Sequence, residues 1–274
     1  GRTAASPHSA DGISMKLSAL FPRYEEAQRE RVFAELLPRV WSLIEPAARA
    51  NINLTIDAEE SERLELSLDV MDALAARIAT SFPQWGGFGL AVQSYLTTAL
   101  AVVDEVAAMA RRHGLKFMVR LVKGAYWDAE IKHAQTRGLA GYPVYTRKAS
   151  TDVAYLVCAA RLLAQRERLY PQFASHNAHS AAAVLALAGS TEGFEFQRLQ
   201  GMGEELYAQV VGEAHLGVAC RVYAPVGSHE ELLPYLVRRL LENGANTSFV
   251  NRIVDARVPV EVIREDSQLK PELA

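Results

Sequence analysis

Short apolar segments typical of β-strands alternate with longer helical segments along almost the whole chain. The candidate strands are Ile13–Leu17, Ile52–Asp57, Phe88–Gln93, Phe117–Val122, Gln172–Ser175, Phe194–Leu199 and Cys220–Tyr223. The candidate helices are Glu25–Ala50, Glu62–Ala79, Thr97–His113, Asp152–Gln165, Ala178–Ala188, Glu204–Val211 and Glu230–Asn243. This alternation, without an internal break in composition, predicts one domain with a parallel sheet. Runs such as FMVRLV and NLTID are apolar enough for strands that are covered on both faces.

The number of candidate strands leaves two architectures open. A (β/α)8 barrel needs eight strands, whereas a doubly wound sheet usually has fewer. Residues 1–12 are small and polar, which is typical of a linker and not of a strand. Residues 256–274 have weak patterning and are expected to form a tail. The folded domain would therefore occupy residues 13–255.

Polar or reactive side chains stand at the carboxyl ends of most candidate strands. They are Lys16, Asp57, Gln93, Arg120, Lys123, His176, Asn177, Gln197 and Tyr223. In a barrel these ends converge on one rim, where active sites are built. Each residue taken singly is more simply explained as a polar strand end, but their succession favours an α/β fold of the (β/α)8 TIM-barrel type. Because the set is rich in Arg, Lys and Tyr, we expect an anionic ligand.

Charge and composition argue against several classes of protein. Half of the 274 residues are hydrophobic and 22% are charged, which is ordinary for a globular domain. The net charge of −3 argues against a nucleic-acid binder, which would need a basic excess. Cys158 and Cys220 are far apart in the sequence, which suits a reducing compartment and no disulfide framework. Neither a membrane-spanning apolar run nor a signal-peptide pattern occurs, so we expect a cytoplasmic protein.

An adjacent arginine pair lies in a leucine-rich helical segment, YLVRRLLENGANTSFVNR. Tyr235, Arg238, Arg239 and Glu242 are spaced so that they share one side of a helix. Two neighbouring guanidiniums repel each other, and burying them in part is costly unless they share an anion such as a carboxylate or phosphate. A surface helix in which Arg238 pairs with Glu242 explains the spacing equally well.

The residues alone leave three further functions open. A Schiff-base lyase could use Lys16 or Lys123 at a strand end. A metal-dependent hydrolase could use Asp57, Glu59, His176 and His179, although a structural histidine is commoner than a ligand. The third alternative is a catalytically silent barrel that binds an anion.

Eight segments carry a resemblance to a known family. They are ISMKLSAL, IDAEESERLE, MVRLVKGAYWD, GYPVYTRK, FASHNAH, FEFQRLQGMGE, CRVYAPVG and YLVRRLLENGANTSFVNRI. In number, order and spacing, from about Ile13 to Ile253, the chain resembles the proline dehydrogenase domain of the bifunctional proline utilization A flavoenzymes. The resemblance implies a (β/α)8 barrel that holds FAD non-covalently and oxidises L-proline to Δ1-pyrroline-5-carboxylate. It further implies that electrons pass to a membrane quinone, and it allows for peripheral contact with the inner face of the membrane.

The resemblance also implies roles for individual residues. The implied substrate site, which also accepts carboxylate-bearing analogues of proline, comprises Lys16, Leu199, Tyr223, Tyr235, Arg238 and Arg239. The implied catalytic groups are Lys16, Asp57, Arg120, Tyr223, Arg238 and Arg239. The implied FAD contacts are Gln93, Arg120, Val122, Lys123, Gly124, Tyr126, Trp127, Arg147, Lys148, His176, Asn177, Gln197, Leu199, Glu242, Ser248 and Phe249. Within these sets Lys16, Arg238 and Arg239 would bind the carboxylate.

Two features set this chain apart from the family pattern. The family's first barrel strand, which carries an acidic gate, has no match before Ile13, so we expect a barrel that is distorted or lacks its first strand. Segments that match the aldehyde dehydrogenase and DNA-binding parts of larger relatives do not occur either, so we expect only the first oxidation. No G-x-G-x-x-G follows a strand, so Lys123–Gly124 and Arg147–Lys148 are expected to contact the cofactor phosphates.

Overall fold

The computed structural model describes residues 4–212, 215–228, 230, 232–233 and 237. The chain divides into two compact units, Gly1–Val222 and Tyr223–Ala274. Six of the expected site residues lie outside the described residues: Tyr235, Arg238, Arg239, Glu242, Ser248 and Phe249. Their roles stay predictions.

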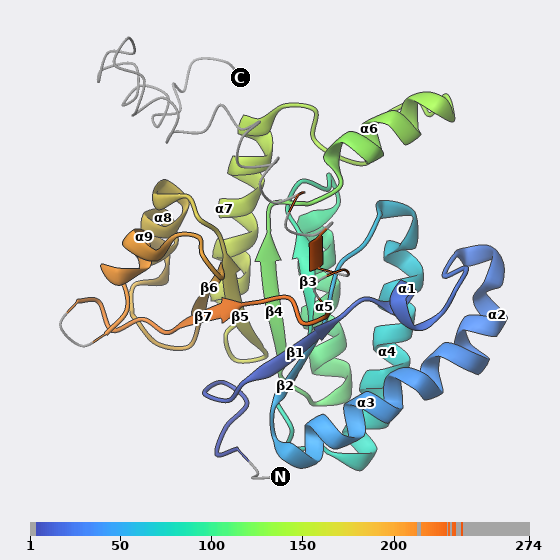
Figure 1. Ribbon diagram of the computed structural model, residues 1–274, viewed down its shortest axis with the longest axis horizontal. Helices are drawn as coiled ribbons and strands as arrows, with labels where there is room; N and C mark the ends of the chain where they lie inside the picture. The colour runs from blue at the N-terminus through green and yellow to red at the C-terminus, as the bar shows by residue number, and fades with distance from the viewer. Residues whose placement is uncertain (1–3, 213–214, 229, 231, 234–236, 238–274) are drawn as a thin grey trace. The chain divides into compact units, whose positions relative to one another are not determined.

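The described residues contain a seven-stranded sheet whose strands follow one another in sequence order (Figure 1). The strands are β1 (Gly12–Met15), β2 (Asn53–Ile56), β3 (Phe88–Gln93), β4 (Phe117–Val122), β5 (Leu169–Ala174), β6 (Glu195–Leu199) and β7 (Cys220–Tyr223). Neighbours from β1 to β6 pair in parallel. The residues of β2 are all buried, as expected for a strand covered on both faces.

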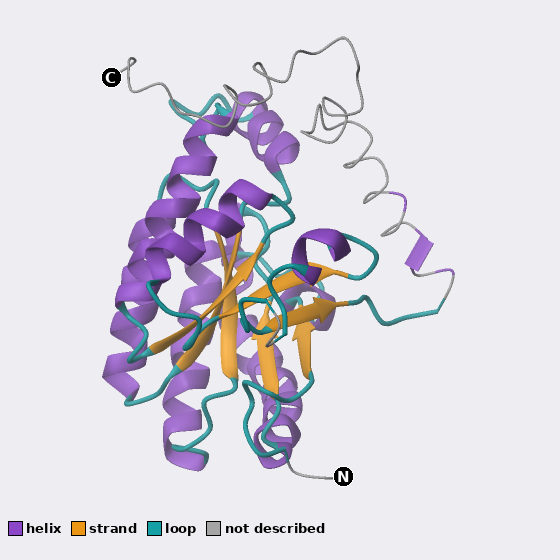
Figure 2. Cartoon of the chain, turned by 90° about the vertical axis from the view of Figure 1, so that its left-hand side faces the viewer, coloured by secondary structure: helices purple, strands orange, loops and turns teal. Residues whose placement is uncertain are grey.

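Helices follow the strands in the sequence, and the long helices cover the outer face of the sheet (Figure 2). The helical segments are α1 (Leu17–Leu20), η1 (Glu26–Gln28), α2 (Arg29–Arg31), η2 (Val32–Leu36), α3 (Leu37–Ala50), η3 (Ser61–Arg63), α4 (Leu64–Ser81), α5 (Ala99–His113), α6 (Trp127–Thr136), α7 (Lys148–Ala164), α8 (Ala178–Ala188) and α9 (Glu204–Ala208). The long helices pack against one another in the order α3, α4, α5, α7 and α8. Parallel strands that alternate with such a layer confirm the expected TIM-type barrel in its distorted form.

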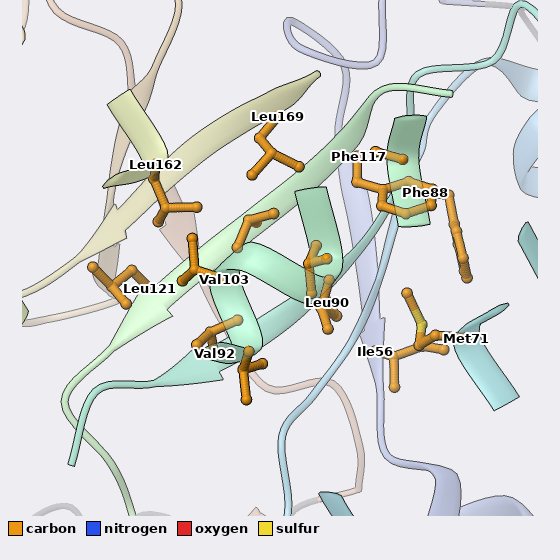
Figure 3. Packing of buried hydrophobic residues seen from close by; sticks show 14 of the residues in the cluster. Ile56, Met71, Phe88, Leu90, Val92, Val103, Phe117, Leu121, Leu162 and Leu169 are labelled. Atoms are coloured by element: carbon orange, nitrogen blue, oxygen red, sulfur yellow. The ribbon is translucent and has the colours of Figure 1, made fainter. Parts of the chain in front are cut away.

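The apolar core fills the space between the sheet and the helix layer (Figure 3). Phe88 on β3 and Phe117 on β4 pack edge to face, with ring centroids 5.8 Å apart. Phe173, Phe194 and Phe196 form a second aromatic group, with centroid separations of 5.6 to 6.3 Å. Edge-to-face packing of this kind adds about 0.5–1.5 kcal/mol per pair to the burial of the rings themselves.

Several elements differ from the sequence expectations, and three of these differences concern the site. Strand β1 ends at Met15, so Lys16 precedes helix α1 and is not a strand residue. Helix α6 was not expected, and α7 begins at Lys148, four residues before the predicted start. Strand β5 begins at Leu169 and includes Pro171, although a proline cannot donate to the ladder and is unusual inside a strand; its neighbours Tyr170 and Gln172 stay paired with β4.

Residues 4–11, which we call the N-terminal segment, contain no strand but pack against the barrel. The His8 ring stacks on Tyr170 of β5, with centroids 4.2 Å apart. Arg221 of β7 donates to the carbonyl oxygens of His8 and Ala10. The linker-like composition of this segment therefore does not prevent it from making specific contacts with the amino-terminal parts of two strands.

Candidate active site

Arg120 lies at the centre of the polar residues inside the barrel. Its Nη1 donates to Asp57 Oδ1 at 2.7 Å, and its Nη2 donates to Ser14 Oγ at 2.6 Å. Its Nε donates to Gln197 Oε1 at 2.7 Å. These partners come from or directly follow β2, β1 and β6, while Arg120 belongs to β4. One side chain can reach all three elements only because the sheet curls around it.

The strand register explains why these polar groups share the barrel interior. Arg120 is the register partner of Gln172, and Gln172 is the partner of Glu195. Register partners on parallel strands project their side chains on the same face of the sheet. Gln197 follows Glu195 by two positions, so it projects on that face as well. Three adjacent strands thus supply a row of buried polar side chains.

Asp57 directly follows β2 and is mostly buried, with 18% of its side chain exposed. Burial raises the pKa of this carboxyl above its usual value, and the nearby charges of Arg120 and Lys16 offset part of that shift. In the ion pair with Arg120, the Asp57 carboxylate lies next to a cation. The expectation that Asp57 supports the pocket is consistent with this position.

Lys16 and Tyr126 bring the start of α1 next to the start of α6. Lys16 Nζ donates to the Tyr126 hydroxyl, and it lies 5.1 Å from the centre of the Tyr126 ring. Lys16 is exposed, and its charge also acts on Asp57. Lys16 and Arg120 therefore place two positive charges near the Asp57 carboxylate, toward the carboxyl ends of β1, β2 and β4.

The loop after β4 is held by Gln93 and Tyr95. Gln93 Nε2 donates to the carbonyl of Glu59 at 2.9 Å, and its Oε1 accepts from the Ala125 N–H at 3.3 Å. Gly124 has φ of 149°, and a Cβ at this position would lie 2.4 Å from the Tyr95 ring. Any side chain here would strain the backbone and displace the ring, so only glycine lets the loop pass this close to Tyr95.

Two further cations lie where α7 begins. Arg147 is the residue before the helix and Lys148 is its first residue; both are exposed, and the first turn contains no acid. A helix amino terminus with two cations favours an anion such as a phosphate. Lys123, on the loop after β4, forms an ion pair with Asp152 of the same helix.

The remaining expected residues make local contacts. His176 Nε2 accepts from the N–H of Leu199 at 2.9 Å, which joins the ends of β5 and β6. Asn177 Oδ1 accepts from the N–H of Ser180 and so caps α8. Trp127 donates through Nε1 to the Tyr145 carbonyl, and the Val122 carbonyl accepts from the N–H of Ser94.

The expected roles of Asn177 and Trp127 at a cofactor stay predictions. Tyr223 is the last residue of β7 and belongs to the second unit.

Comparison with known proteins decides the family. The family model described as proline dehydrogenase matches residues 2–252. The chain belongs to the proline dehydrogenase family. The bifunctional protein PutA of Salmonella typhimurium is 54% identical over 265 residues, which are 94% of this chain and 20% of that protein. Hydroxyproline dehydrogenase of Bos taurus is 31% identical, over 76% of this chain and 46% of that protein.

Solved structures agree with the family and the fold. A variant of proline utilization A from Bradyrhizobium japonicum is 54% identical, with a TM-score of 0.88 over 98% of this chain and 28% of that one. A structure of proline utilization A with proline bound in remote sites is 53% identical, with a TM-score of 0.89 over 100% of this chain and 29% of that one. The chain spans about a fifth of the length of the curated PutA proteins it matches.

Three residues of the candidate site were not anticipated from the sequence: Ser14, Glu195 and Arg221. Ser14 lies in β1, and neither its type nor its spacing marks it as a partner for Arg120. Glu195 is 1% exposed and pairs with Arg221 at 2.8 Å. A signal for Glu195 was present, since it alternates with Gln197 on one face of a strand that also contains Phe196 and Leu199, and a charged residue is unusual in a covered strand.

Among the residues the structure describes, no group of three or more His, Cys, Asp or Glu side chains is placed to hold a metal ion. None of the described helices combines the length and apolar character needed to cross a membrane. Glu59, a candidate ligand in the hydrolase alternative, accepts from the N–H of Ser18 and from Arg63.

Proposed function

We propose that this chain catalyses the FAD-dependent oxidation of L-proline to Δ1-pyrroline-5-carboxylate and passes the electrons to a quinone. The observation that carries the proposal is the convergence of Lys16, Asp57 and Arg120 at the carboxyl ends of three strands of a proline dehydrogenase barrel. Proline carries a carboxylate, and a cationic rim attracts this group.

The residues present suit a flavin nucleotide. The two cations at the start of α7 offer a site for the phosphates, and Gly124 lets the backbone after β4 lie close to Tyr95. Arg120, Gln197 and Gln93 offer a buried guanidinium and two amides, which suit the polar edge of an isoalloxazine ring. Bound there, FAD supplies the two-electron acceptor for the C–H bond next to the proline nitrogen.

The chain's own residues orient the substrate and balance its charge. Lys16 would bind the proline carboxylate, together with Arg238 and Arg239 as the proposed clamp. Such a clamp fixes the face of the ring that is oxidised, which is the positioning part of catalysis. Arg120, held by Asp57, would stabilise negative charge that develops beside it in the cofactor site. Proline loses one hydride from carbon and one proton from nitrogen, and the product carries the C=N bond.

We further propose the boundaries and surroundings of the domain. Residues 13–255 would form the catalytic barrel, with residues 1–12 before it and the tail 256–274 after it. The reaction would take place in the cytoplasm, with peripheral contact at the inner membrane face where the quinone is found. Tyr223, Tyr235 and Leu199 would wall the proline ring.

A visible absorption spectrum tests the proposal. The purified protein should be yellow, and adding proline without an acceptor should bleach the flavin bands. Adding a soluble quinone should then restore them. A colourless protein that does not take up FAD would contradict the proposal, and trapping of a substrate by borohydride would support the Schiff-base alternative instead.

A further inference from the structure

A buried carboxylate connects the flavin-side arginine to the amino-terminal part of the barrel. Glu195 is 1% exposed, and its Oε1 accepts from Gln172 Nε2, Gln197 Nε2 and Arg221 Nε, each at 2.8 Å. Its Oε2 accepts from Arg221 Nη2 at 3.0 Å. Four charge-assisted hydrogen bonds hold this carboxylate in one orientation, because moving it would leave several buried donors unpaired.

Gln197 transmits this orientation to Arg120. Its Oε1 accepts from Arg120 Nε at 2.7 Å, while its Nε2 donates to Glu195 Oε1. With a cation at one end and an anion at the other, only one sense of the amide is favourable. A flipped amide would point its NH2 group at the guanidinium N–H and its oxygen at the carboxylate. Glu195 therefore determines which way the Gln197 carbonyl points.

The guanidinium plane of Arg120 depends on that carbonyl. Asp57 and Ser14 hold the two terminal nitrogens, and Gln197 holds Nε. Without an acceptor at Nε, the head group could turn about its contacts with Asp57 and Ser14. A planar group that is fixed at three points keeps the geometry that electrostatic stabilisation requires.

Arg221 ties the far end of the network to the N-terminal segment. Besides its two contacts with Glu195, it donates to the carbonyl oxygens of His8 and Ala10. Glu195 is thus neutralised by a cation that is itself fixed by backbone groups, so the carboxylate does not need to move toward Arg120 for compensation.

We propose that Glu195 is a positioning residue for the flavin reaction, which acts on Arg120 through the Gln197 amide without touching substrate or cofactor. This inference deepens the proposed function and rests on it, since it takes Arg120 as the cation beside the flavin. The buried polar side chains of β4, β5 and β6 (Arg120, Gln172, Glu195 and Gln197) would then serve catalysis as well as folding.

The test compares two buried glutamates, of which Glu195 is connected to Arg120 through Gln197 and Glu130 accepts hydrogen bonds from Ser61 instead. Glu195→Gln keeps size and removes the charge that orients Gln197. Glu130→Gln is the matched control, because Glu130 is also buried and accepts from the N–H and hydroxyl of Ser61, at 2.6 Å each, outside this network. Both variants are expected to melt at a lower temperature, so stability alone does not decide the question.

Flavin reduction by proline separates the two variants. Glu195→Gln should lower the limiting rate of flavin reduction about tenfold, with a proline Kd changed less than about twofold, and should shift the flavin midpoint potential. Glu130→Gln should leave all three unchanged. If the potential and the limiting rate in Glu195→Gln equal those of the wild type, the proposal is overturned.

A readout that needs no activity keeps the two proposals distinguishable. The Arg120 Nε–H signal in a nitrogen-resolved NMR spectrum, assigned by its loss in Arg120→Lys, reports the bond to Gln197. It should shift in Glu195→Gln and stay in place in Glu130→Gln, even if the protein proves not to oxidise proline. An unmoved signal in Glu195→Gln overturns the inference whether or not the proposed function holds.

A second variant tests the proposal in case Glu195→Gln does not fold. Glu195→Asp keeps the charge for Arg221 but draws the carboxylate back by one methylene from Gln197. We expect it to fold and to show the same shift in the Arg120 signal. An Asp variant with wild-type signal, potential and rate would overturn the proposal.

Discussion

The Nη1 atom of Arg120 lies 2.7 Å from Oδ1 of Asp57, although the two residues are 63 positions apart in the sequence. The pair is largely shielded from water, with 11% of the arginine and 18% of the aspartate side chain exposed. A buried cation of this kind needs its counter-charge, because the energy of taking it out of water is otherwise not recovered. Asp57 therefore supports both the fold and the charge of the candidate active site.

Asp57→Ala should destabilise the protein by about 3–5 kcal/mol, since it leaves Arg120 buried without its carboxylate. Urea unfolding followed by circular dichroism measures this change. Asp69→Ala is the control, because Asp69 pairs with Arg29 at an exposed position and should cost less than about 1 kcal/mol. Equal effects of the two substitutions would show that the Asp57 pair is no more shielded than a surface pair.

Lys16→Met should weaken the binding of a proline analogue that keeps its carboxylate, by about 2–5 kcal/mol if the charge contacts it directly. A titration followed by the flavin spectrum measures the Kd. Lys132→Met, on the exposed side of α6, controls for the loss of one positive charge from the molecule. Unchanged affinity in Lys16→Met would place Lys16 outside the pocket.

Arg239→Met should raise KM for proline and lower kcat/KM while flavin stays bound, because it removes a charge-assisted contact to the carboxylate. Arg239 lies outside the described residues, so this prediction depends on the family resemblance. Steady-state kinetics with a soluble quinone measure it, and identical proline kinetics would remove Arg239 from the clamp.

Alkaline pH should unfold the protein together with ionisation of its buried tyrosines. Burial raises the pKa of Tyr24 to about 12 from its ordinary value of 10, and it also raises the pKa values of Tyr95, Tyr155, Tyr170 and Tyr207. Above pH 10 the unfolded chain loses these protons while the folded chain keeps them. The free energy of unfolding therefore falls as pH rises from about 10 toward the folded-state pKa values.

The near-ultraviolet absorbance of tyrosinate and the circular dichroism signal should change together in this pH range. Tyr155→Phe removes one of these groups and should shift the transition to higher pH. Tyrosine ionisation that is complete before any loss of secondary structure would contradict the effect of burial.

Strand β4 illustrates how much of the fold and of the candidate site could be predicted from the sequence. The apolar run around Arg120 was enough to place a covered strand, and the alternation of such strands with helices was enough for a parallel sheet. The polar residues at the strand ends and the family resemblance were needed to favour the barrel. Residues such as Lys123 and Asp57 could be assigned to one rim for the same reason, since parallel strands end on the same side. These inferences depend on local periodicity, which any stretch of sequence carries by itself.

Other features depended on contacts between distant segments. The short β1, the start of α7 at Lys148 and the extra helix α6 were misjudged, because packing overrides weak local preferences at element ends. The composition of residues 4–11 predicts a linker, yet Arg221 and Tyr170 hold them against the barrel. No local pattern contains the partner that makes such a segment ordered.

The sequence by itself determined the family, the order of the strands and the kinds of residue that gather at the rim. Only the tertiary structure decided that Arg120 donates hydrogen bonds to Asp57, Ser14 and Gln197, and that Gln197 in turn donates to Glu195. The physical reason is that strand periodicity sets the face on which a side chain lies, whereas the curl of the sheet sets which faces meet. Hydrogen bonds across the barrel interior follow from that curl.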